Sequence, residues 1–172
     1  METRKLTLLA TLIVLASGLH FLENMIPIPL PVPGIKFGFA NTITLCTIVL
    51  LGFSEALWVA VLRVLMGSLL GGFLFSVTFA MSLAGSVASA LAMYLVFRLA
   101  KDQLSLISVS ICGAIVHNLA QLMVAAGVVQ TAGVFAYLPY LLFFALPTGF
   151  ITGFISIKLV HHFQNMPRFG NR

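Results

Sequence analysis

Long apolar segments alternate with short polar or proline-containing breaks along this chain. A helix that crosses the hydrocarbon core of a bilayer needs about 20 predominantly apolar residues, which is close to the length of most of these segments. The pattern therefore predicts an all-α membrane protein with six transmembrane helices. The predicted helices run approximately from Leu6 to Met25, Phe37 to Leu51, Ala56 to Phe73, Phe79 to Phe97, Leu104 to Val128 and Leu138 to Val160. No polar stretch is long enough to fold on its own, so residues 1–172 are predicted to form a single membrane domain.

The break between the first two predicted helices contains four prolines that alternate with aliphatic residues, namely Pro27, Pro29, Pro31 and Pro33. Each proline lacks an amide donor and disfavours the helical conformation of its predecessor, so this segment must be extended. At about 3.1 Å per residue, the prolines span about 20 Å, whereas packed helices lie about 8 to 10 Å apart. Because the segment is longer than a turn requires and is apolar, we predict that residues 27–36 cover the mouth of the helical bundle.

Composition and charge support this class and orient the chain. Hydrophobic residues make up 60% of the sequence and charged residues only 8%, far below the roughly 25% of soluble proteins. The basic residues lie at segment ends, which accounts for the net charge of +5 without nucleic-acid binding. The excess of Lys and Arg marks the cytoplasmic side, so both termini and the tail of residues 161–172 are predicted to be cytoplasmic and residues 27–36 extracytoplasmic. The residues used are Arg4, Lys5, Arg98, Lys101, Lys158, Arg168 and Arg172, against Lys36 on the other side.

The amino-terminal segment has an alternative interpretation. Arg4 and Lys5, an apolar core and then residues 16–18 (Ala-Ser-Gly) are similar to a cleavable signal peptide. The apolar run continues to Ile26, which is too long for a typical signal core, and this favours a retained first helix. The two cysteines, Cys46 and Cys112, lie in apolar runs and are expected in the core. The sequence predicts no disulfide framework, metal site or cofactor.

Polar residues within the apolar helices are the strongest pointers to function, because charge near the middle of a membrane costs about 2.5 to 3.5 kcal/mol. Three predicted helices carry such residues at one depth beneath the proline segment, which predicts a ligand pocket there. For His117 alone, a hydrogen-bonded core histidine would be the simpler interpretation. The residues are His20, Glu23 and Asn24 on the first helix, Lys36 and Asn41 at the start of the second, and His117, Asn118 and Gln121 on the fifth.

Arg63 lies deeper, roughly 10 Å from the cytoplasmic start of the third predicted helix at 1.5 Å per residue. A guanidinium keeps its charge, so it must snorkel to the interface, pair with a carboxylate or meet an anionic ligand. The sequence identifies no partner. Structural pairing or a role in conformational coupling is slightly favoured over direct contact with substrate.

Small residues recur at helical spacing, which lets helix backbones approach each other in lipid. Gly67 and Gly71, and again Gly149 and Gly153, form GxxxG patterns that predict internal packing. A stripe on the first helix predicts either internal packing or contact with a partner subunit. It contains Thr7, Ala10, Thr11, Ser17 and Gly18.

Three ordered motifs carry a resemblance to a known family. They are residues 34–41 (GIKFGFAN), 63–71 (RVLMGSLLG) and 117–121 (HNLAQ). Together they resemble the Gx transporter family, which is often labelled heptaprenyl diphosphate synthase component I, and the match covers nearly the whole chain. That family is itself similar to the S components of energy-coupling factor (ECF) transporters, six-helix membrane proteins that bind vitamins or related micronutrients.

The resemblance implies a substrate-binding subunit in the bacterial cytoplasmic membrane. S components capture substrate beneath the loop between their first two helices and associate with a transmembrane coupling protein and two ATPases. The gating loop would then contain Pro27, Pro29, Pro31, Pro33 and Gly34. The substrate-binding residues would be His20, Glu23, Lys36, Asn41, Arg63, His117, Asn118 and Gln121, with Lys36 attracting an anionic ligand. Docking on the coupling protein would use Thr7, Ala10, Thr11 and Val14, in place of the AxxxA pattern of many S components.

The family label suggests a rival function as a subunit of a polyprenyl diphosphate synthase. Prenyl transfer requires clustered carboxylates that hold magnesium ions, but this chain has a single aspartate, Asp102, and scattered glutamates. We therefore predict that the chain is not an enzyme by itself, and that in the rival function it is a non-catalytic subunit. An autonomous transporter is less favoured, because no inverted repeat is evident.

The substrate itself is unresolved at the level of sequence. A mixture of aromatic residues, an apolar lid and a few polar donors suits a small amphipathic compound, with a carboxylate or phosphate as an option. An isoprenoid or quinone precursor would reconcile the transporter and synthase associations. The aromatic residues considered are Phe73, Phe75, Phe79 and Tyr137.

Overall fold

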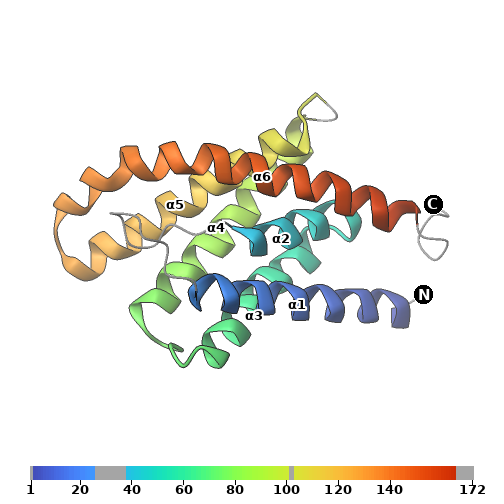
Figure 1. Ribbon diagram of the computed structural model, residues 1–172, viewed down its shortest axis with the longest axis horizontal. Coiled ribbons are helices and arrows are strands. Elements are labelled where there is room, and N and C mark those ends of the chain that lie inside the picture. Colours follow the sequence, from blue (N-terminus) through green and yellow to red (C-terminus); the bar gives the residue numbers. More distant parts are fainter. Residues whose placement is uncertain (1, 26–37, 101–102, 166–172) are drawn as a thin grey trace.

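The structure is a computed structural model that describes residues 2–25, 38–100 and 103–165, and these form a bundle of six α-helices with one short 3-10 helix (Figure 1). All six predicted helices are present, with boundaries within a few residues of those expected. The elements are α1 (Glu2–Met25), α2 (Phe39–Leu50), α3 (Phe53–Leu70), α4 (Val77–Ala100), α5 (Leu106–Val129), η1 (Ala132–Tyr137) and α6 (Leu138–Asn165).

Helix α2 is short and central. Its 12 residues rise about 18 Å, which is less than the roughly 30 Å of a hydrocarbon core. Every residue from Ala40 to Ile48 is buried, and α2 packs against α1, α3, α4, α5 and α6. An apolar helix of this length is more often a buried core helix or a re-entrant segment than a full span. The described part of the chain therefore has five helices that are long and apolar enough to cross a membrane, with α2 buried among them.

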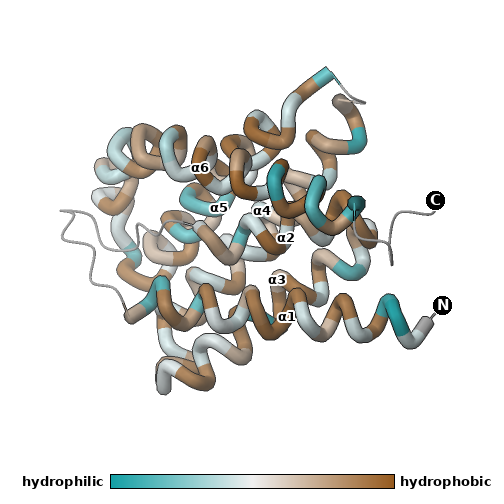
Figure 2. The backbone as a smooth tube through the Cα atoms, turned by 45° about the vertical axis from the view of Figure 1, so that its right-hand side comes forward, coloured by the Kyte–Doolittle hydropathy of each residue, from teal (hydrophilic) through white to brown (hydrophobic). Residues whose placement is uncertain are grey.

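The surface of the bundle is apolar, as expected for a multi-pass membrane protein. Hydrophobic positions occur along every helix (Figure 2), and large apolar side chains such as Trp58, Phe143 and Phe150 are exposed. A helical bundle that exposes hydrophobic residues on this scale is suited to lipid rather than water.

The start of α1 and the end of α6 lie at the same end of the bundle (Figure 1). At this end, the ammonium group of Lys5 on α1 pairs with the carboxylate of Glu55 on α3. Helix α6 continues beyond the predicted end to Asn165, so His161 and His162 lie in its last turns.

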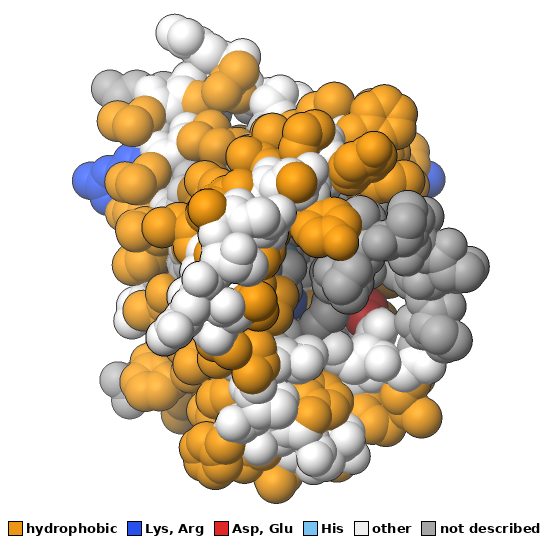
Figure 3. Space-filling view, turned by 90° about the vertical axis from the view of Figure 1, so that its left-hand side faces the viewer, with side chains coloured by type: hydrophobic (Ala, Val, Ile, Leu, Met, Phe, Trp, Pro, Cys, Tyr) orange, Lys and Arg blue, Asp and Glu red, His pale blue; other side chains and the backbone are white. Residues whose placement is uncertain are grey.

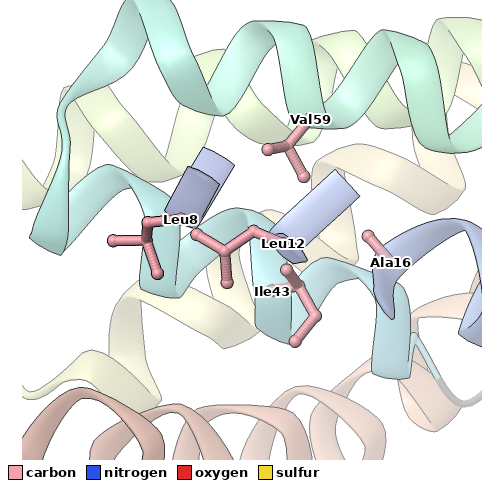
Figure 4. Packing of buried hydrophobic residues seen from close by; sticks show 5 residues of the cluster. All are labelled: Leu8, Leu12, Ala16, Ile43 and Val59. Atoms are coloured by element: carbon pink, nitrogen blue, oxygen red, sulfur yellow. The ribbon is translucent and has the colours of Figure 1, made fainter. Parts of the chain in front are cut away.

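A hydrophobic cluster holds α1 against α2 and α3 in the half of the bundle nearer the start of α1 (Figure 4). It consists of Leu8, Leu12, Ala16, Ile43 and Val59. The cluster thus packs the first half of α1 against its two neighbours.

Close backbone contacts use the predicted glycines. A Cβ atom added to Gly149 or Gly153 of α6 would lie 2.6 Å from the Cα atom of Ile111 or Ile107 on α5, respectively. On α3, a Cβ atom at Gly67 would lie 2.6 Å from the His20 ring of α1. Internal packing is thus confirmed for these three positions. Two of the contacts position α5 against α6, and the third positions His20.

Candidate functional site

All six helices contribute to one polar cavity. Of the eight predicted substrate-binding residues, seven line it and the eighth, Lys36, lies outside the described residues. The predicted gating residues Pro27, Pro29, Pro31, Pro33 and Gly34 also lie outside the described residues. The lining consists of His20, Glu23, Gly38, Asn41, Arg63, Ser82, Ser110, Ala114, His117, Asn118, Gln121, Thr148 and Thr152.

Arg63 is the central charge of the cavity, and its side chain is only 2% exposed. Its Nη2 donates hydrogen bonds to Oδ1 of Asn41 (2.6 Å) and to Oγ of Ser86 (2.7 Å), and its Nε donates to the same Ser86 oxygen (3.1 Å). Ser86 in turn donates to the carbonyl of Ala60 (2.9 Å). The guanidinium of Arg63 on α3 is thus held by Asn41 of α2 and Ser86 of α4. These are hydrogen-bond partners that the sequence did not identify.

Glu23 closes the cavity where α1 ends and α2 begins. Its carboxylate accepts a hydrogen bond from the backbone amide of Phe39 in the first turn of α2, where an acidic group is favoured by the exposed amides and the helix dipole. Glu23 is also close enough to Arg63 for electrostatic attraction. Gly38 precedes the helix with φ of 72°, a conformation that glycine adopts readily. Glu23 therefore links the two helices that residues 26–37 connect.

Helix α5 presents His117 and Gln121 to the cavity from one face, four residues apart as predicted. Both pack over Gly85 of α4, where an added Cβ atom would lie 2.9 Å from Cε1 of His117 and 3.0 Å from Cγ of Gln121. Asn118 donates from Nδ2 to the carbonyl of Leu141 on α6 (3.0 Å). Part of the Asn118 amide thus serves to join α5 to α6.

The far wall contains residues that the sequence did not single out. Ser110 of α5 and Thr152 of α6 share a hydrogen bond of 2.7 Å between their hydroxyl oxygens, and Thr148 lies one turn from Thr152. Ser110 and Ala114 lie seven and three residues before His117, so they share its helix face. That spacing was the signal that could have found them.

The cavity opens toward the end of the bundle opposite the start of α1. Figure 3 views this end, and a small area of acidic and of basic side chains is visible deep in the surface. The cavity is small, with a volume of about 30 Å³. The aromatic residues considered in the sequence do not belong to the described lining of this cavity. Phe73, Phe75, Phe79 and Tyr137 are absent from the lining, and Phe75 is 84% exposed.

A family model described as heptaprenyl diphosphate synthase component I matches residues 12–159. The chain belongs to this family. No curated protein and no solved structure matches the chain.

The part of the chain that matches the heptaprenyl diphosphate synthase component I family contains every lining residue of the cavity, from His20 to Thr152. The four predicted docking residues are all exposed on α1. Only Val14 among them lies inside the matched region, whereas Thr7, Ala10 and Thr11 precede it. The described lining of the cavity therefore falls wholly within the family model, whereas most of the predicted docking face does not.

Proposed function

We propose that this protein is the substrate-binding subunit of an ECF-type importer and that the polar cavity is its substrate site. The observation that carries the proposal is the buried cluster of Arg63, Glu23 and Asn41 at a cavity within an apolar bundle. Charged groups inside a membrane are costly and are typically retained for ligand or ion binding. The proposal places both termini in the cytoplasm, because the basic residues gather at that end.

The transmembrane coupling protein and the two ATPases are proposed partners on the basis of the resemblance to S components. The exposed face of α1 that carries Thr7, Ala10, Thr11 and Val14 is the proposed docking surface. Small side chains there would let a partner helix approach closely. The hydroxyls of Thr7 and Thr11 donate to the carbonyls of Thr3 and Thr7 on their own helix, so a partner would meet a surface with few free donors.

A second candidate function follows from the description of the family. In it, the chain is the non-catalytic membrane subunit of a polyprenyl diphosphate synthase. The whole sequence contains only four acidic residues, of which one is an aspartate, Asp102. This is too few for the clustered carboxylates of a magnesium-dependent prenyl transfer site. Catalysis would belong to a soluble partner, and the cavity would need another role.

Copurification from the organism that encodes the protein separates the two functions. The tagged full-length chain is extracted in mild detergent and its partners are identified by mass spectrometry. We expect a transmembrane coupling protein with two ATPases. Recovery of a soluble aspartate-rich prenyl synthase instead would support the second function, and recovery of neither would contradict both.

The docking surface is tested with a matched pair of variants in the same experiment. Val14 and Val128 are both exposed valines, on α1 and α5 respectively. We expect Val14→Trp to lose the coupling protein and Val128→Trp to retain it. Equal recovery with both variants would show that α1 is not the docking helix.

The cavity is tested by ligand retention in the purified protein. Asn41→Ala removes an acceptor for Arg63, and His117→Ala opens the wall formed by α5. Thr44→Ala is the control, because Thr44 is equally buried on α2 but bonds only to the carbonyl of Ala40. We expect the first two variants to lose the copurifying small molecule and the control to keep it. Unchanged retention in folded Asn41→Ala and His117→Ala would exclude this cavity as the substrate site.

A further inference from the structure

The guanidinium of Arg63 keeps one edge available to the cavity. An arginine side chain carries five N–H donors, and Arg63 uses Nε and Nη2 for Ser86 and Asn41. None of the hydrogen bonds among the described residues involves Nη1 of Arg63. Because Arg63 lines the cavity, a bound molecule can reach a charged donor group whose position is already fixed by two neighbours.

Most residues of the described lining carry a polar side chain. Ala114 is the only aliphatic side chain in it, and it contains no aromatic carbocycle. Ligand pockets are more often mainly hydrophobic, with a small number of placed polar groups. Gln121 and the Ser110–Thr152 hydroxyl pair add donors and acceptors that are themselves buried. Such a wall offers several hydrogen-bonding groups to the hydrophilic part of a ligand.

We propose that the cavity binds an anionic oxygen group, a carboxylate or a phosphate, against the Nη1 edge of Arg63. This inference rests on the proposed function and narrows its substrate class to small polar anions. Arginine matches the planar spacing of carboxylate and phosphate oxygens, and charge-assisted hydrogen bonds strengthen where water is excluded. Glu23 lines the same cavity and is attracted to Arg63, so a bound anion competes with Glu23 for the positive charge.

Thermal unfolding of the full-length protein in detergent tests this inference with defined probes. The probes are acetate and inorganic phosphate as anions, acetamide and glycerol as neutral compounds, and tetramethylammonium as a cation, all at constant ionic strength set with chloride. We expect an anion to raise the unfolding midpoint in a saturable way, while the neutral and cationic probes leave it unchanged. Acetate alone would assign a carboxylate ligand and phosphate alone a phosphorylated one. No effect of either anion would overturn the inference.

Three variants assign the effect to Arg63. We expect Arg63→Gln to abolish the anion response and Arg63→Lys, which keeps charge but loses the fork of donors, to weaken apparent affinity at least ten-fold. Arg98→Gln is the control, because Arg98 is exposed and bonds to Tyr94 outside the cavity. An undiminished response in Arg63→Gln would show general salt stabilisation and overturn the inference.

If Arg63→Gln does not fold, the inference is tested by the anion affinity of Arg63→Lys and by the anion selectivity of the wild-type protein. An unchanged affinity in Arg63→Lys would then contradict the role of the guanidinium. Copurification of the coupling protein does not depend on this chemistry. A wild-type protein that recovers the ATPases but ignores both anions would therefore refute the anion site and leave the importer function standing.

Discussion

Replacement of Gly153 by alanine should separate α5 from α6 at the wall of the cavity. The added Cβ atom would lie 2.6 Å from the Cα atom of Ile107, 3.0 Å from Cβ of Ser110 and 3.2 Å from the amide nitrogen of Ile107. Two of these three atoms belong to the backbone of α5, which cannot rotate away as a flexible side chain can. The helices themselves must move.

The size of the effect follows from these distances. Carbon atoms pack at about 3.5 to 4.0 Å, so relief of the 2.6 Å contact requires a local separation of about 1 Å. Overpacking of this kind costs about 1 to 3 kcal/mol. Alanine also favours a helix over glycine by about 1 kcal/mol, which partly hides the cost. The informative quantity is therefore the difference from a glycine-to-alanine change that meets no obstacle.

Gly18 provides that control, because it lies within α1 and an added Cβ atom there has no neighbour within 4 Å. We expect Gly153→Ala to have a free energy of unfolding about 1 to 3 kcal/mol below that of Gly18→Ala. The assay is reversible unfolding in mixed micelles, followed by circular dichroism. If the two variants are equally stable, α5 and α6 do not approach each other as closely as described, and the reasoning fails.

Three further substitutions test other contacts. Ser86→Ala leaves Nε of Arg63 without its acceptor and should lower the free energy of unfolding by about 1.5 to 3 kcal/mol. The control is Ser89→Ala, because it removes only a hydrogen bond to a backbone carbonyl. Gly85→Ala should displace the side chains packed over it and reduce ligand retention, and retention equal to wild type would contradict this packing. Lys5→Gln removes an ion pair whose lysine is half-exposed and should change the free energy of unfolding by less than about 1 kcal/mol. A larger loss of stability in the same unfolding assay would show that this ion pair does not behave as a surface pair.

The number and order of helices could be predicted because long apolar runs have few alternatives. The burial of α2 among the other helices could not be predicted, although its boundaries were predicted to within a few residues. Its burial on all sides is a tertiary property that arises from five neighbouring helices. The local sign of this burial is a set of compact threonines whose hydroxyl groups form hydrogen bonds within the bundle. They are Thr42, Thr44 and Thr47.

The candidate site was predictable where its residues are rare in membranes. Arg63, His117 and Gln121 are conspicuous in apolar helices, and the structure brings them to one cavity. Ser110 and Thr152 were missed because serine and threonine can bond to their own helix and so carry little positional information. Thr152 does bond to the carbonyl of Thr148, and it also contacts Ser110 across the helix interface.

The hydrogen bond between Glu23 and Phe39 gives the cavity a physical connection to residues 26–37. Glu23 lies at the end of α1 and Phe39 at the start of α2, so one carboxylate ties together the two ends of that connection. The same carboxylate is attracted to Arg63. Under the proposed function, an anion at Arg63 neutralises part of the charge that holds Glu23 in place. Ligand binding is therefore expected to weaken the link that Glu23 makes between the end of α1 and the start of α2.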